Sequence, residues 1–99
     1  MNTPALKSPS SQNVQINADV LWQRLDDEVI VMQLKTDHIY SLNHTGARLW
    51  ELLAGGKDLP SIRIELENEF SVSPDSLAAE IDETLALLIG EQLLVTPEP

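Results

Sequence analysis

The sequence predicts an α+β fold in which a three-stranded antiparallel β-meander is followed by a three-helix bundle. Short runs rich in β-branched and aromatic residues occupy the first half of the chain, separated by breaks of two or three polar residues. In the second half, apolar residues instead recur at helical spacing, with glycine and proline at the boundaries. At 99 residues, the chain has the length of one such domain.

The strands are expected at residues 20–25, 28–34 and 38–42. Asp26-Asp27 and Lys35-Thr36-Asp37 separate them, and connections this short force antiparallel neighbours in the spatial order 1-2-3. The middle strand is apolar at both alternating sets of positions, so we expect both of its faces to be covered. Helices can cover one face. The other needs the N-terminal tail, a second subunit or a partner.

The helices are delimited by caps and breakers. Asn43 is the expected N-cap of the first helix, and Gly55-Gly56 ends it. Asp58 caps the second helix, which has Pro60 in its first turn, and Ser73-Pro74 starts the third. The apolar stripe of the third helix consists of Leu77, Ile81, Leu85 and Leu88.

The two ends of the chain differ in their expected structure. Residues 1–18 mix proline, serine and polar residues and are expected to form a flexible tail before a folded domain at 19–96. At the other end, Leu93-Leu94-Val95 either packs back on the domain or pairs as a short strand. The resulting order of three strands and three helices is similar to a winged helix-turn-helix.

Composition restricts the compartment and the partners. The chain has no cysteine and no apolar run of signal-peptide or membrane-span length, which predicts a cytoplasmic protein with no membrane partner. The net charge is −10, and from residue 60 onward nine acidic residues accompany one basic residue, Arg63. Because such a surface repels phosphate, we expect no nucleic-acid partner.

Catalytic and metal-binding motifs are absent from the sequence. The histidines, His38 and His44, have no cysteine or HExxH spacing to form a metal site with. Gly55-Gly56 lies in neither a GxGxxG nor a phosphate-loop pattern, and the chain contains no GxSxG elbow. We therefore expect no enzyme activity, no metal and no cofactor.

The third strand has the composition of an unprotected sheet edge. In a 1-2-3 meander it lies at the edge, and residues 38–42 contain neither the proline nor the lysine that commonly blocks strand addition. An unblocked edge can accept an extended peptide as a further strand. The alternative is that the last helix or Leu93–Val95 covers this edge.

Residues 37–53, DHIYSLNHTGARLWELL, resemble the signature of the PqqD-like family. The shared features are an aromatic strand end, Leu42-Asn43 with Gly46-Ala47 three residues later, and an apolar helix that contains Trp50. The resemblance extends over about residues 20–95. Ahead of Leu42-Asn43, Lys35-Thr36-Asp37 departs from the Pro-Glu-Gly expected in the pyrroloquinoline quinone pathway member.

The resemblance implies a non-catalytic protein that binds the leader of a ribosomally made precursor peptide and presents it to a modifying enzyme. That enzyme would be a radical-SAM enzyme of pyrroloquinoline quinone synthesis or an enzyme of the lasso-peptide type. In the family, the leader adds as a strand to the third β-strand, in the groove shared with the last helix. The residues implied here are His38, Ile39, Tyr40, Ser41, Leu42, Ile81, Thr84, Leu85 and Leu88.

Two other classes of function stay open at this point. The fold also fits a winged-helix regulatory or scaffolding protein, and the exposed sheet fits a homodimer. On the third helix, Ile81 and Leu85 also fit a plain core role, more so than Thr84 and Leu88.

Overall fold

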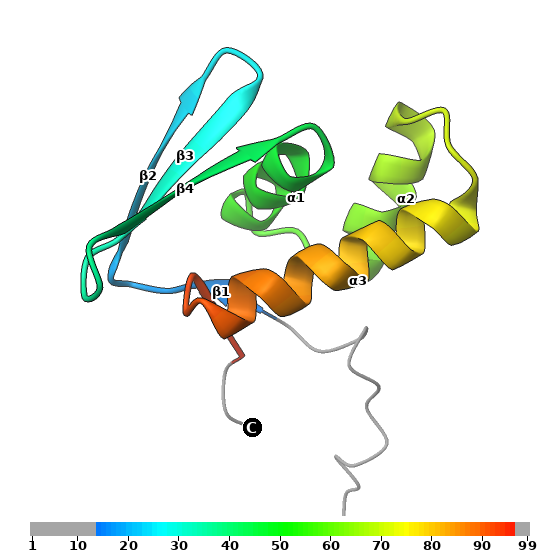
Figure 1. Cartoon of the computed structure of the whole chain (residues 1–99). Helices are drawn as coiled ribbons and strands as arrows, with labels where there is room; N and C mark the ends of the chain where they lie inside the picture. Colours follow the sequence, from blue (N-terminus) through cyan, green and yellow to red (C-terminus); the bar gives the residue numbers. More distant parts are fainter. Residues whose placement is uncertain (1–13, 97–99) are drawn as a thin grey trace, which may run out of the picture.

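A three-stranded sheet lies on one side of the molecule and three helices lie on the other (Figure 1). The computed structural model describes residues 14–96. In chain order, the elements are β1 (Gln15–Ile16), β2 (Val20–Leu25), β3 (Glu28–Gln33), β4 (His38–Asn43), α1 (Thr45–Ala54), α2 (Leu59–Glu69), α3 (Pro74–Gly90) and β5 (Leu94–Val95). This order confirms the predicted α+β fold.

The main sheet is the predicted antiparallel meander, in the order β2-β3-β4. The two-residue turn Asp26-Asp27 pairs Leu25 with Glu28, and the longer turn after β3 pairs Gln33 with His38. Leu34, expected in the middle strand, lies beyond the end of β3 and is exposed.

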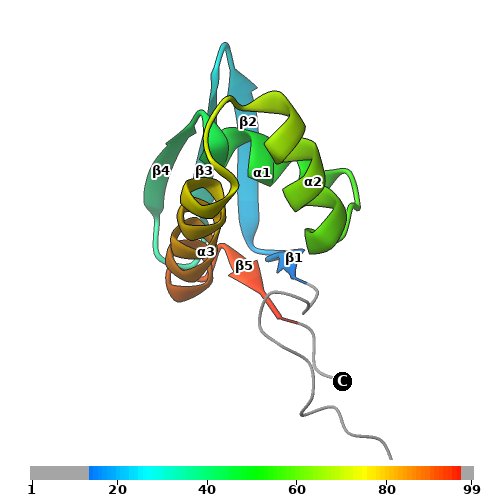
Figure 2. The same ribbon diagram turned by 90° about the vertical axis from the view of Figure 1, so that its right-hand side faces the viewer.

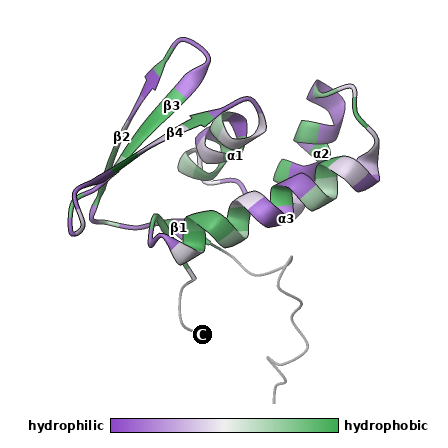
Figure 3. Ribbon diagram, in the orientation of Figure 1, coloured by the Kyte–Doolittle hydropathy of each residue, from purple (hydrophilic) through white to green (hydrophobic). Residues whose placement is uncertain are grey.

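The core lies between one face of this sheet and the helices (Figure 2). Val29 and Val31 of β3 are fully buried, as are Leu49 and Trp50 of α1. Trp22 of β2 meets Trp50 edge to face, with ring centroids 6.3 Å apart. Figure 3 shows hydrophobic colouring along β3 and on the C-terminal half of α3. From α2 and α3 the core receives Leu59, Ile62, Leu66, Leu77, Ile81, Leu85 and Leu88.

The packed unit begins earlier than residue 19. Gln15 and Ile16, which the sequence analysis placed in a flexible tail, form β1 and pair with Val95 and Leu94 of β5. Of the two alternatives left open for Leu93–Val95, pairing as a short strand is therefore the one observed, at Leu94–Val95. Ile16 packs against the core. This burial explains why a segment with few apolar residues forms a strand beside β5. The rest of the expected tail, residues 1–13, lies outside the described residues.

The prediction that Asn43 is the N-cap of α1 is wrong. Asn43 is the last residue of β4, where it pairs with Glu28, and the N-cap position falls to His44. His44 has φ 49° and makes no side-chain capping hydrogen bond. Pairing with Glu28 therefore keeps the Asn43 backbone extended, and the chain turns into α1 at His44. Asp58 and Ser73 do cap α2 and α3, accepting from the amides of Ser61 and Ser76.

Gln33 is a buried polar residue at the end of β3, with no solvent exposure. Its Nε2 donates to the Gln92 carbonyl at 2.7 Å, and its Oε1 accepts from the Lys35 amide at 2.7 Å. The same Gln92 carbonyl accepts from Asn17 Nδ2 at 2.8 Å. The Gln33 side chain therefore joins the turn after β3 to the turn after α3, and the shared Gln92 carbonyl also links Asn17, in the chain that enters β2.

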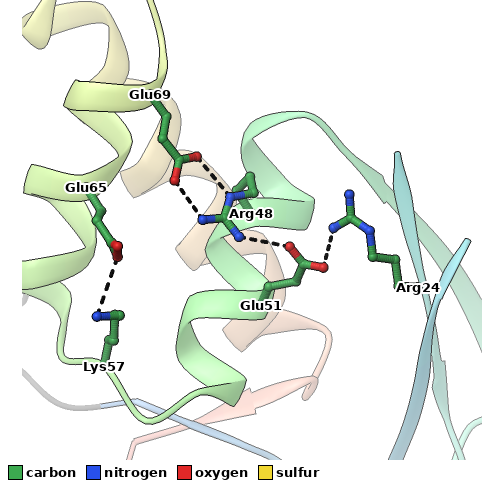
Figure 4. A network of polar contacts seen from close by, with 6 residues as sticks. All are labelled: Arg24, Arg48, Glu51, Lys57, Glu65 and Glu69. Carbon is green, nitrogen blue, oxygen red and sulfur yellow. Dashed lines mark hydrogen bonds and ion pairs between the residues drawn. The ribbon is translucent and has the colours of Figure 1, made fainter. Parts of the chain in front are cut away.

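A network of ion pairs connects the sheet to the first two helices (Figure 4). Arg48 of α1 holds Glu69 of α2 through two hydrogen bonds, Nε–Oε1 at 2.9 Å and Nη2–Oε2 at 2.6 Å. Arg48 also donates to Glu51 at 3.0 Å, and Glu51 pairs with Arg24 of β2. The Arg24 guanidinium, followed by that of Arg48, lowers the pKa of Glu51 below its ordinary value, and Arg48 lowers that of Glu69.

We predict that Gln33→Leu destabilises the fold by about 1–3 kcal/mol, because it leaves the Gln92 carbonyl and the Lys35 amide without this buried partner. Urea unfolding measures the change. Gln23→Leu on the exposed side of the same sheet is the matched control and should shift the midpoint little. Equal effects of the two substitutions would contradict the bridging role of Gln33.

We predict that Arg48→Met lowers the free energy of unfolding by about 1 kcal/mol at neutral pH. A carboxylate whose folded-state pKa is lowered stabilises the fold above its unfolded pKa, and the gain disappears as the pH falls through the folded value. The difference from the unmodified chain should therefore shrink as the pH falls below the ordinary glutamate pKa of about 4.3, and it should vanish once both carboxylates are protonated in the folded state. Lys57→Met, which breaks the more exposed Lys57–Glu65 contact at 3.7 Å, is the control with little effect at either pH.

Candidate peptide-binding edge and groove

The strand β4 has one free edge. It pairs with β3 along its whole length, and the main sheet ends there in the order β2-β3-β4. The short strand β5, which the sequence left as one candidate to cover this edge, pairs instead with β1. Among residues 14–96, no strand is therefore hydrogen-bonded to the outer side of β4.

Alternation divides the side chains of β4 between two faces of the sheet. His38, Tyr40 and Leu42 pair with the buried residues of β3 and lie on the helix side. Leu42 is buried and Tyr40 is half-buried. Ile39 and Ser41 lie on the opposite face, where Ile39 is 61% exposed. A strand added to β4 would therefore have one row of its side chains facing toward the helices and one away from them.

One flank of α3 runs beside β4 on the helix side. Near its middle, Thr84 Cγ2 lies 3.9 Å from the point where a Cβ on Gly46 would stand, and Leu42 Cβ lies 3.5 Å from that point. Just past the helix end, the Tyr40 hydroxyl donates to Glu91 Oε1 at 2.7 Å. These two contacts set the flank of α3 from Thr84 to Glu91 beside β4, and we refer to the surface between them as the candidate groove.

The predicted α3 residues separate into two groups. Ile81, Leu85 and Leu88 are 1%, 8% and 1% exposed, so their side chains fill the core and do not line an open groove. Thr84 is half-buried beside Leu42. Position 88 follows the buried stripe and not the flank beside β4, so Leu88 lies with Ile81 and Leu85 in the core, whereas Thr84 does not.

Two further residues of this flank, which the sequence analysis did not name, are candidates for the groove. Leu87 lies between Thr84 and Glu91 on the same flank of the helix and is 56% exposed. The sequence signal that could have found Leu87 is that it is apolar and directly precedes Leu88 of the α3 stripe, so it lies outside that stripe. Glu91 is marked only by its contact with Tyr40, which joins residues 51 positions apart, and no local pattern predicts such a contact.

The polar end of the groove is formed by Tyr40, Glu91 and His38. The hydrogen bond to the Glu91 carboxylate raises the pKa of Tyr40 above its ordinary value. The phenol therefore stays neutral and keeps donating at physiological pH. The His38 ring meets the Tyr40 ring edge to face, with centroids 6.3 Å apart. This end can take a polar or cationic group, while Leu42, Thr84 and Leu87 form the apolar part of the groove.

No group of three or more histidine, aspartate or glutamate side chains within 14–96 is placed to hold a metal ion. None of the helices in this part of the chain combines the length and apolar character needed to cross a membrane.

Comparison with known proteins identifies relatives of this fold. Among solved structures, TbiB1 in complex with the TbiA(beta) leader peptide matches with a TM-score of 0.79 and 28% sequence identity, over 86% of this chain and 99% of that one. No curated protein sequence matches. The family model of PqqD, coenzyme PQQ synthesis protein D, matches residues 28–94, which include β3, β4 and all three helices. The chain therefore belongs to the PqqD family.

Proposed function

We propose that this chain is a leader-peptide recognition protein that binds the leader of a ribosomally made precursor as a strand added to β4. The observation that carries the proposal is the unpaired edge of β4 beside the flank of α3. The solved complex of TbiB1 with a leader peptide supports it, because the two chains share the fold over nearly the whole of TbiB1.

The register suggests which backbone groups of β4 would meet the leader. The N–H and C=O of a strand residue point to the same side, so Ile30 can bond to Gln23 or to Ser41 but not to both. A tight two-residue turn favours a hydrogen-bonded pair at Leu25 and Glu28, and alternation then assigns Ile30 to Gln23. We infer that the N–H and C=O of Ser41 face the free edge. The same argument applies to Ile39.

Affinity and selection would come from different parts of this surface. Backbone pairing along residues 38–42 binds peptides with little regard to sequence. The groove of Leu42, Thr84 and Leu87 favours an apolar leader side chain, and the end near Tyr40 and Glu91 favours a polar or cationic one. The sequence-predicted set is therefore proposed again with Leu87 and Glu91 added, and with Ile81, Leu85 and Leu88 as the support beneath the groove.

The chain would act without catalysis. By holding the leader, it raises the effective concentration of the attached precursor at a modifying enzyme, which performs the chemistry. The acidic helices suit a leader that carries basic residues and oppose phosphate, which weighs against the winged-helix regulatory alternative. A second copy of the chain is a candidate partner on the opposite face of the sheet, which is a different surface.

We predict that Ser41→Pro abolishes leader binding, because proline removes an outward N–H and its ring obstructs the added strand. Fluorescence anisotropy with the labelled leader of a precursor encoded beside this chain measures the affinity. Ser41→Ala is the matched control, since it loses the same hydroxyl but keeps the N–H, and it should bind nearly as well as the unmodified chain. Unchanged binding by a folded Ser41→Pro variant would exclude β4 as the docking edge.

We predict that Leu87→Asp weakens leader binding at least about tenfold, because it places a charge in the apolar part of the groove. Ile64→Asp is the matched control: Ile64 is 61% exposed against 56% for Leu87, but it lies on α2. The same titration measures both variants. If both lost affinity equally, or neither did, Leu87 would have no part in the groove.

A further inference from the structure

The Glu91 carboxylate, at the polar end of the candidate groove, has no cationic partner among residues 14–96. The chain has six lysines and arginines, of which Lys7 lies outside those residues. The others all pair with different carboxylates: Arg24 and Arg48 with Glu51, Arg48 also with Glu69, Lys35 with Asp19, Lys57 with Glu65, and Arg63 with Asp82. The described part of the chain therefore leaves the charge of Glu91 uncompensated.

The same carboxylate is held in place beside β4. It accepts from the Tyr40 hydroxyl at 2.7 Å, and Glu91 is half-buried. The His38 ring approaches the Tyr40 hydroxyl from the other side, with Nδ1 at 3.4 Å. One accepted hydrogen bond leaves most of the acceptor capacity of a carboxylate unused. Glu91 can therefore accept from a bound peptide without losing its contact with Tyr40.

A strand added to β4 would cover this carboxylate and remove water from it. Burying a charge without a partner of opposite sign is costly, and an acidic side chain in the peptide would add repulsion. A neutral polar side chain replaces only the lost hydrogen bonds, whereas an ammonium or guanidinium group also compensates the charge. Charge complementarity therefore favours a lysine or arginine of the peptide at Glu91.

We propose that Glu91 selects leaders in which a lysine or arginine stands two residues from a large apolar residue. This inference rests on the proposed binding of the leader at β4. Tyr40 and Leu42 lie two residues apart on the helix side of β4, so the positions of an added strand opposite them are also two residues apart on that side. The basic side chain then meets Glu91, and the apolar one meets the groove at Leu42 and Thr84.

Exchange of charge between the chain and its leader tests this selection. The probe is the labelled synthetic leader of the precursor encoded beside this chain, titrated by fluorescence anisotropy at about 50 mM and about 500 mM salt. Glu91→Gln keeps an oxygen for the Tyr40 hydroxyl but removes the charge. It should weaken binding about three- to tenfold at the lower salt and less at the higher salt. Glu91→Lys should weaken binding further, and a leader whose basic residue is changed to glutamate should restore it.

Glu67→Gln is the matched control, because it makes the same change of net charge at an exposed carboxylate of α2. Glu80→Gln, nearer the start of α3, is a second control on the same helix. Both variants should bind the leader nearly as well as the unmodified chain. Unchanged affinity of a folded Glu91→Gln variant would overturn the proposal, as would an equal loss in either control. Tight binding of a leader that contains no lysine or arginine would overturn it too.

A displayed library of random short peptides provides a second readout that does not depend on one leader. Peptides selected by the unmodified chain should be enriched in lysine or arginine two residues from an apolar residue, and those selected by Glu91→Lys in aspartate or glutamate at the same position. Absence of both enrichments would overturn the proposal. If Ser41→Pro abolishes leader binding while the Glu91 variants leave it unchanged, the charge selection fails but leader binding at β4 stands. If Ser41→Pro also binds normally, both proposals fail.

Discussion

The inner face of β3 packs against α1, and the position of the β4 edge relative to the helices depends on this contact. Val29 and Val31 are fully buried there, as are Leu49 and Trp50 on the helix. Because strand side chains alternate, a shift of one residue would exchange the buried and exposed faces of the sheet. Burial of two valines therefore fixes which side of the sheet meets the helices, and with it which side chains of β4 face α3.

The groove depends on connections between distant parts of the chain. Gln33 ties the end of β3 to the turn after α3, and Tyr40 contacts Glu91 just beyond the same helix. Both bonds hold the C-terminal end of α3 beside β4, while Thr84 approaches Leu42 nearer the middle of the helix. A helix flank that is held beside an unpaired strand suits a PqqD-family protein that is proposed to receive an extended peptide.

Charge is distributed unevenly over the molecule. The acidic helices suit a cationic leader and oppose phosphate, whereas Glu28 is the one charged strand residue on the face of the main sheet that is turned away from the helices. The network of Arg24, Glu51, Arg48 and Glu69 uses two of the few cations of the chain to hold β2, α1 and α2 together. Because these two arginines already pair with carboxylates of the fold, they are not free to bind the phosphates of a nucleic acid.

The sequence by itself determined the order of strands and helices, the edge position of β4 and the core stripe of α3, because alternation, helical spacing and caps are local properties. It also suggested residues 38–42 as a docking strand. Only the tertiary structure decided that Asn43 stays in the strand, that Ile16 is packed, and that Leu87 lies on the groove flank while Leu88 is buried. Those outcomes depend on contacts between residues far apart in the chain, such as Tyr40 with Glu91, which local patterns do not record.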